Sequence, residues 1–162
     1  GTRQYRNVVR NPGAILEEGI GILRMDASLF YGNAEAFKDA ALAAFESTAP
    51  ATATDPTDRF LVLDAYPMNR ADSTGLQAVR ELIEEIRSES GSLYLASVKG
   101  PLADKLLAGG IVELVGPENI FREVWQAVEA ARQARDEGRV EEPLSGEIDV
   151  PARIAPKQLL DN

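Results

Sequence analysis

The feature that most constrains the fold is the segment 60–87, where an uninterrupted apolar run is followed by a polar loop and then by a strongly periodic stretch. The run 60–63 (FLVL) does not alternate with polar residues, which is typical of a strand buried on both faces. After the tetrapeptide 72–75 (DSTG), apolar residues return at the three- and four-residue spacing of one helix face. They are Leu76, Val79, Ile83 and Ile86. The order strand, loop, amphipathic helix predicts the first half of a βαβ unit.

The flanking segments extend this α/β pattern. Residues 14–25 indicate a hairpin of two strands around a tight Glu-Gly turn, 92–98 a further strand and 111–115 a brief last strand. Helices are expected from Asn33 to Ser47, from Pro101 to the Gly109-Gly110 pair, and from Pro117 onward. The sum is an α/β fold with a four- to five-stranded mixed sheet, mostly parallel after the hairpin, and three to four helices.

Two segments show no periodicity. Residues 48–57 are rich in Ala, Thr and Pro and predict a variable linker between the first helix and the central strand. Residues 138–162 are acidic and proline-containing and predict a tail without a core of its own. We therefore place one domain at residues 1–137, which suits a chain of 162 residues.

Charge and composition exclude several functions. The net charge of −9 disfavours binding to nucleic acid and to anionic lipid, so we expect neither a nucleic-acid partner nor direct lipid insertion. The chain has no cysteine and no histidine, which removes disulfides, thiolate ligands and the usual base near neutral pH. There is no apolar run of about 18 residues of the kind that crosses a membrane.

The tetrapeptide Asp72-Ser73-Thr74-Gly75 supports two interpretations. Its side-chain oxygens suit a helix N-terminal cap. The same free N–H groups and positive helix end also suit an anion, such as a phosphoryl group on Ser73, although Asp64 and Asp72 would oppose it.

Other site chemistry has less support. A catalytic Ser73 has no histidine to take its proton, so we expect no catalytic site. Asp64 and Asp72 together suit Mg²⁺, but the chain has no nucleotide-binding loop to accompany them, so we expect no metal site. Tyr31 and Asn33 follow the preceding strand and fall on the same edge of the sheet, or else serve as a packed aromatic and a helix cap.

The strand, the sequence DSTGL at 72–76, the amphipathic helix and the segment 93–98 together resemble the STAS domain. This fold is shared by anti-sigma factor antagonists and by the cytoplasmic carboxyl-terminal part of SulP-type anion transporters. The front of the chain resembles the SulP version in residues 5–8 (YRNV), 24–27 (RMDA), 29–35 (LFYGNAE) and 37–38 (FK). The resemblance covers roughly residues 1–133. Asn69-Arg70 depart from it, since the family usually has apolar residues there.

The resemblance implies roles for particular residues. Ser73 matches the serine that a partner kinase phosphorylates in anti-sigma factor antagonists, which makes it the candidate regulatory site. A rim for a partner or a weakly bound nucleotide would combine the loop after the first strand with the loop before the central helix. Its candidate residues are Leu29, Tyr31, Asn33, Asp64, Asp72, Ser73, Thr74 and Gly75.

The function this resemblance implies is a non-catalytic regulatory domain of a sulfate, bicarbonate or dicarboxylate transporter, at the cytoplasmic face of the membrane and without a required cofactor. Its expected partners are the transmembrane domain of the same transporter, a cytosolic protein and a second copy of the domain. The alternative is a stand-alone anti-sigma factor antagonist switched by phosphorylation of Ser73. An enzyme is the least favoured class, because both a base and a phosphate-binding loop are missing.

Overall fold

The computed structural model describes residues 19–49 and 59–138, and these form one α/β domain. Its sheet has four strands in the order β1-β2-β3-β4, all parallel. The strands are β1 (Ile20–Arg24), β2 (Phe60–Asp64), β3 (Ser92–Ala96) and β4 (Ile120–Phe121). The antiparallel strand that would make the sheet mixed was expected at residues 14–18, which lie outside the described residues.

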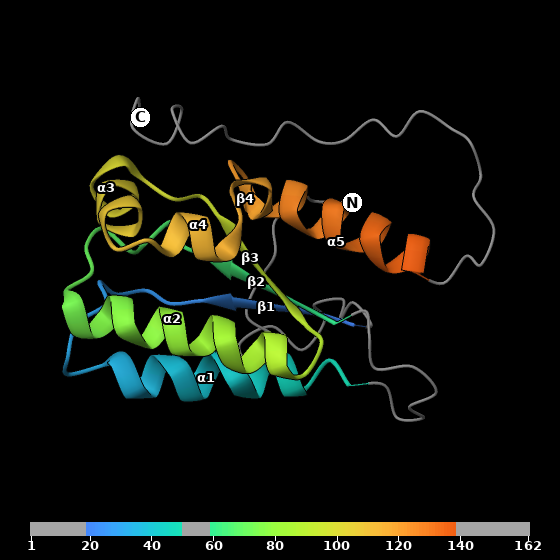
Figure 1. Ribbon diagram of the computed structural model, residues 1–162, viewed down its shortest axis with the longest axis horizontal. Coiled ribbons are helices and arrows are strands. Elements are labelled where there is room, and N and C mark those ends of the chain that lie inside the picture. The colour runs from blue at the N-terminus through green and yellow to red at the C-terminus, as the bar shows by residue number, and fades with distance from the viewer. Residues whose placement is uncertain (1–18, 50–58, 139–162) are drawn as a thin grey trace.

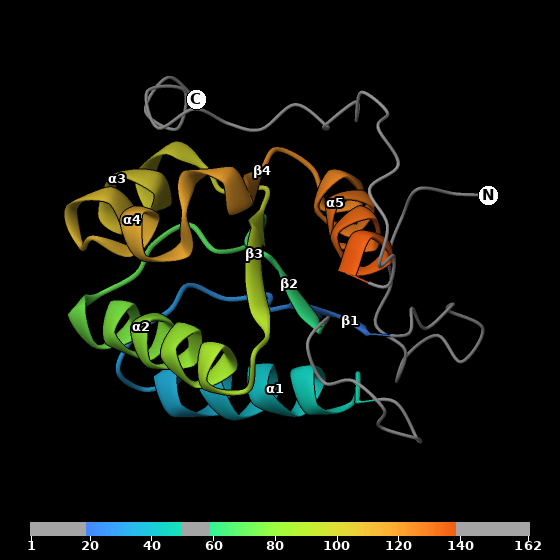
Figure 2. The same cartoon turned by 45° about the vertical axis from the view of Figure 1, so that its right-hand side comes forward.

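Five α-helices connect and cover the strands, one or two more than expected. They are α1 (Ala34–Glu46), α2 (Ser73–Ser88), α3 (Gly100–Ala108), α4 (Ile111–Val115) and α5 (Val124–Gly138). Helices α1 to α4 lie on one face of the sheet and α5 lies on the other (Figures 1 and 2). Because all strands are parallel, the loops that follow β1, β2 and β3 share one edge of the sheet.

The β2–α2 unit follows the prediction closely. All five residues of β2 are buried, as a central strand with helices on both faces requires. Helix α2 begins after Asp72, whose side chain caps it, and buries three of the four residues of the expected stripe, whereas Leu76 is only half-buried. The buried residues are Gly75, Ala78, Val79, Leu82, Ile83 and Ile86.

The sheet separates two apolar cores because successive strand side chains point to opposite faces. Leu61 and Leu63 lie in the core under α1 to α4. Phe60, Val62 and Tyr94 lie in the core under α5. The rings of Phe60 and Tyr94 have centroids 5.4 Å apart, and those of Tyr94 and Phe121 5.3 Å, so aromatic contacts run across three strands.

The prediction for residues 111–120 was wrong. Residues 111–115 form helix α4 rather than a strand. The helix expected from Pro117 begins only at Val124, as α5, after a 3₁₀ turn (Pro117–Asn119) and β4. The segment IVELV buries its first, second and fifth residues, which is helical spacing. It is bounded by Gly110 (φ 69°) and Gly116 (φ 93°), whose left-handed backbone ends the helix on both sides. A run this short does not distinguish the two structures by its apolar pattern alone.

Arg59 ties together three elements at the other edge of the sheet. Its guanidinium donates to the Phe45 carbonyl (3.0 Å), to Thr48 Oγ1 (3.2 Å) and to Glu89 Oε2 (3.2 Å). It also lies 4.0 Å from the centroid of the Phe45 ring. The end of α1, the start of β2 and the end of α2 are thereby fixed to one another.

Most of the expected linker (48–57) and nearly all of the expected tail (138–162) lie outside the described residues. Within residues 19–49 and 59–138, no helix combines the length and the apolar character needed to cross a bilayer.

Candidate functional site

The loops after β1 and β2 lie side by side and form the rim expected from the sequence. The Leu29 N–H donates to the Arg70 carbonyl (2.9 Å), and the Asp72 N–H donates to the Leu29 carbonyl (3.1 Å). Leu29 and Ala71 thus form a parallel bridge beyond the ends of the strands. The two loops are held together by backbone hydrogen bonds, which do not depend on side-chain identity.

Asp72 joins this rim to helix α2. Its Oδ1 accepts from the Gly75 N–H (2.8 Å), and its Oδ2 accepts from the Tyr31 N–H (3.0 Å) across the two loops. These N–H donors, Gly75 first, then Tyr31 and Thr74, lower the pKa of the Asp72 carboxyl because they stabilise its charged form. Asp72 therefore caps α2 and also fixes the loop after β1.

Asn33 stabilises the same loop in a different way from the one expected. It precedes α1, but its side chain makes no capping bond to that helix. Its Oδ1 accepts from the Phe30 N–H (2.9 Å), and its Nδ2 donates to the Ser28 carbonyl (2.8 Å). The amide closes a tight turn over residues 28–33, because an Asn side chain hydrogen-bonds readily to nearby backbone.

The candidate rim residues divide into exposed and buried ones. Ser73 and Thr74 are exposed in the first turn of α2, and Tyr31 is 78% exposed. Leu29 is only 1% exposed and belongs to the core, so it contributes its backbone rather than its side chain to the rim. Gly75 is buried against Leu29: a Cβ at this position would lie 2.8 Å from Leu29 Cγ and 2.9 Å from its carbonyl oxygen.

Asp64 lies apart from the α2 end of the rim. It shares the face of β2 with Phe60 and Val62, which pack under α5, whereas Asp72 leads into α2 on the opposite face. Its Oδ1 accepts from the Tyr66 N–H (3.0 Å), and its Oδ2 is 3.9 Å from Arg24 Nη1. In the described part of the chain, no cluster of three potential metal-ligating side chains forms.

Sequence reasoning named Tyr31 but missed the other aromatic and basic side chains at this edge, those of Phe30, Tyr66 and Lys99. Tyr66 is 56% exposed, and Lys99 Nζ lies 4.0 Å from the centroid of its ring and 3.5 Å from Asn69 Oδ1. The rings of Phe30 and Tyr31 meet edge to face at 5.8 Å. The available signal was the occurrence of aromatic residues in the loops that follow two strands.

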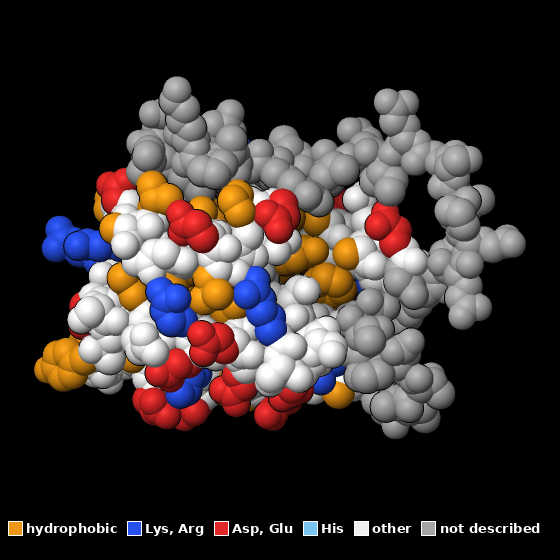
Figure 3. All heavy atoms as spheres, in the orientation of Figure 1, with side chains coloured by type: hydrophobic (Ala, Val, Ile, Leu, Met, Phe, Trp, Pro, Cys, Tyr) orange, Lys and Arg blue, Asp and Glu red, His pale blue; other side chains and the backbone are white. Residues whose placement is uncertain are grey.

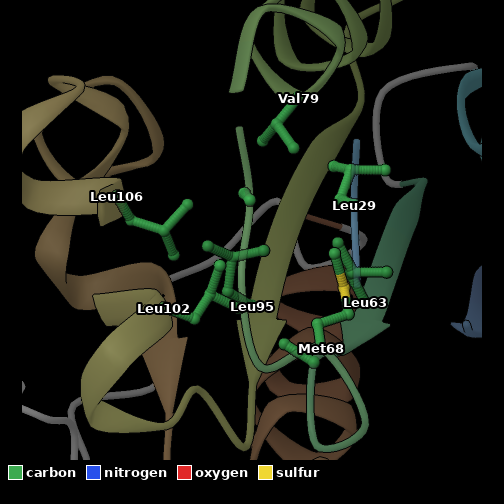
Figure 4. Close-up of a pocket in the computed structure, with 9 residues that line it drawn as sticks. Leu29, Leu63, Met68, Val79, Leu95, Leu102 and Leu106 are labelled. Carbon is green, nitrogen blue, oxygen red and sulfur yellow. The ribbon is translucent and has the colours of Figure 1, made fainter. Parts of the chain in front are cut away.

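Below the rim lies a small apolar cavity of about 10 Å³ (Figure 4). Its lining residues come from the sheet, both rim loops, α2 and α3, and include Leu29, Leu63, Met68, Val79, Leu95, Leu102 and Leu106. This volume is about that of a single water probe, whereas small-molecule sites usually exceed roughly 300 Å³. This cavity is therefore too small for a small-molecule ligand.

Comparisons with known proteins place this geometry in context. The family model of the STAS domain matches residues 11–127. Probable sulfate transporter 4.2 of Arabidopsis thaliana is 31% identical over 133 residues, which are 80% of this chain and 20% of that protein. The chain thus spans about a fifth of the length of the curated relatives it matches.

Solved structures show the same fold. A sulfate transporter family protein from Wolinella succinogenes has a TM-score of 0.62 at 20% identity, covering 81% of this chain and 99% of its own. The murine solute carrier 26 family member A9 anion transporter has a TM-score of 0.65 at 20% identity, covering 82% and 21%. A putative anti-sigma factor antagonist from Thermotoga maritima has a TM-score of 0.59 at 19% identity, covering 73% and 92%. The predicted α/β fold of anti-sigma factor antagonist type is confirmed.

Proposed function

Because the chain belongs to the STAS domain family, we propose that it is the non-catalytic regulatory and protein-interaction domain of a SulP-type anion transporter. The observation that carries this proposal is the match to a sulfate transporter at 31% identity. The chain covers only 20% of that transporter's length, as expected for one domain of a larger protein. In this assignment the domain works at the cytoplasmic face of the membrane and needs no cofactor. Its first partner is the transmembrane part of the same polypeptide.

The alternative is a free-standing anti-sigma factor antagonist. Its support is a structural likeness at 19% identity, which is evidence of a common fold alone. A relative with higher sequence identity, 31%, is a sulfate transporter, and this higher identity favours the transporter assignment.

The test of the assignment is the reading frame amino-terminal to Gly1 together with a transport assay. We expect several apolar segments of about 20 residues upstream, each long enough to cross a bilayer. In cells or vesicles, replacing residues 19–138 of the full-length protein by an unrelated domain should change the rate of sulfate uptake. A frame that starts near Gly1 beside a sigma-factor regulator would instead support the antagonist.

Within this assignment we place regulation at Ser73, which is exposed at the first position of α2. Asp72, not Ser73, provides the helix cap, so a change at Ser73 leaves the capping bonds in place. A phosphoryl group there would add negative charge at the positive end of α2, on the rim formed by the loops after β1 and β2.

The Ser73→Glu variant of the full-length transporter is therefore expected to change transport rate or partner affinity by about threefold or more. The melting temperature of the domain should change by no more than about 2 °C, as for other surface substitutions. Thr74→Glu, which places the same charge on the exposed neighbour, is the matched control. If both variants act equally, regulation is not specific to Ser73; if Ser73→Glu unfolds the domain, the residue is structural.

A further inference from the structure

The carboxyl edge of the sheet carries exposed aromatic side chains. Within residues 19–49 and 59–138, the exposed large hydrophobic residues are Phe30 (45%), Tyr31 (78%) and Tyr66 (56%). All three lie in the loops after β1 and β2, which the Leu29–Ala71 bridge holds side by side. Exposed apolar groups that gather at one place on a soluble domain commonly mark a contact site.

The acidic side chains of this edge already have partners. Asp72 accepts two backbone N–H bonds at 2.8 and 3.0 Å. Asp26 lies 2.8 Å from the Arg24 guanidinium, and Asp64 accepts from the Tyr66 N–H and lies 3.9 Å from the same arginine. Each of these carboxylates therefore already accepts a hydrogen bond within the domain.

Two cations at the same edge have no carboxylate partner among the described residues. In the described parts of the chain, no carboxylate lies within salt-bridge distance of Arg70 or Lys99. Arg70 is exposed, and the Lys99 ammonium contacts the Tyr66 ring and the neutral Asn69 amide. On a chain whose net charge is −9, these two cations are thus available to the carboxylates of another molecule.

We infer that Phe30, Tyr31, Tyr66, Arg70 and Lys99, termed the aromatic–basic edge, bind a short acidic segment of a partner protein. Apolar side chains of that segment would cover the rings, and its carboxylates would pair with the two cations. This inference rests on the proposed interaction function and specifies the chemistry of the partner.

Charge complementarity favours a short segment over an extended anionic surface. Figure 3 shows hydrophobic and basic side chains projecting at its left-hand end, with acidic side chains above them and more acidic side chains along α1 and α2 below. A nucleic acid or an anionic bilayer would extend beyond the aromatic–basic edge and meet this acidic surface. At physiological salt, electrostatic interactions extend over about 8 Å, so a short segment interacts chiefly with the charges closest to it. A basic segment would be repelled by Arg70 and Lys99.

Two parts of the edge are held by contacts within the domain. The Tyr31 N–H donates to Asp72, and the Tyr66 ring packs against the Lys99 ammonium. Binding then orders few additional groups, which reduces its entropic cost.

The experiment uses the ¹⁵N-labelled 162-residue chain and two synthetic peptides of equal length. One peptide alternates Glu with Leu, and the other has Gln in place of every Glu. The Glu peptide is expected to shift the amide signals of Tyr31, Tyr66 and Lys99, and to bind more weakly as salt is raised. Its affinity should exceed that of the Gln peptide by about tenfold or more, since two charge-assisted contacts are lost in the latter.

The variant Arg70→Gln/Lys99→Gln is expected to lower the affinity of the Glu peptide by about tenfold or more. Lys105→Gln removes one positive charge from an exposed position near the end of α3 and is the control; its affinity should stay within about twofold of the original. An unchanged amide spectrum away from the edge shows that the variants are folded.

Equal affinity for the two peptides, shifts confined to another surface, or no shift at millimolar peptide would each overturn the inference. If vesicles of phosphatidylcholine and phosphatidylglycerol shift the same amides and the Glu peptide does not, the edge faces a membrane instead. If only the peptide-binding inference fails, sulfate uptake by the full-length protein still depends on the domain. If the proposed function fails, sulfate uptake does not depend on it.

Discussion

The Gly75→Ala variant is expected to lose about 1–3 kcal/mol of unfolding free energy, because the added methyl group enters a space that is already filled. The new Cβ would lie 2.8 Å from Leu29 Cγ and 2.9 Å from the Leu29 carbonyl oxygen. That carbonyl accepts the Asp72 N–H, and the Leu29 side chain is buried, so neither atom can move freely. The higher helix propensity of alanine offsets only part of this cost. Urea denaturation followed by far-UV circular dichroism measures the difference.

Gly32→Ala is the matched control. Its Cβ would also approach a neighbour closely, at 2.7 Å, but that neighbour is the ring of Phe30, which is 45% exposed and can turn toward solvent. We expect a loss below about 1 kcal/mol. Equal losses in the two variants would show that the contact between α2 and the loop after β1 is not the cause.

The Asp72→Ala variant is expected to melt roughly 3–8 °C below the original chain at pH 7, since it removes a helix cap and the bond between the two loops. Both N–H groups released, those of Tyr31 and Gly75, lose their carboxylate acceptor. The amide signal of Tyr31 should broaden or shift most, because its loop is no longer fixed to α2. Differential scanning calorimetry and amide spectra test the two parts of this expectation.

The effect of Asp72 should also depend on pH. Its pKa is lower in the folded state, so its contribution to stability is present above the unfolded pKa of about 3.9 and is lost as pH falls through the folded pKa. The difference in melting temperature between the original chain and Asp72→Ala should therefore be largest above about pH 5 and shrink toward pH 2. Asp104→Ala, at an exposed position on α3, should show no comparable trend. A difference that is constant with pH would contradict the carboxylate interpretation.

Local patterns were sufficient to predict the central part of this fold. In β2 and α2, the apolar run, the capping residue and the helical stripe all indicate the same structure, so no tertiary contact has to override them. The segment 111–115 lacks such agreement, because its strand-forming residues are enclosed by two glycines that set a helical turn. The two-residue strand β4 is fixed by its pairing with β3 and by burial in both cores, which depend on tertiary contacts.

The candidate site was predictable in its position but not in its contacts. The rule that sites gather at the carboxyl edge of parallel strands placed Tyr31, Asn33 and Ser73 together. It could not indicate that the Asn33 amide bonds within its own loop, or that Asp72 reaches Tyr31, because these bonds depend on how two loops meet. The proximity of Lys99 to Tyr66 likewise arises only when β3 pairs with β2.

Because of the Arg59 contacts, the architecture of the domain does not depend on the length of chain between α1 and β2. It bonds to Thr48 directly, so the points where the chain leaves α1 and enters β2 stay adjacent whatever connects them. Doubling the length of a flexible connection costs only about 0.6 kcal/mol. Insertions of an epitope or a fluorescent reporter between positions 50 and 58 should therefore leave the sheet, and the edge at its far end, intact.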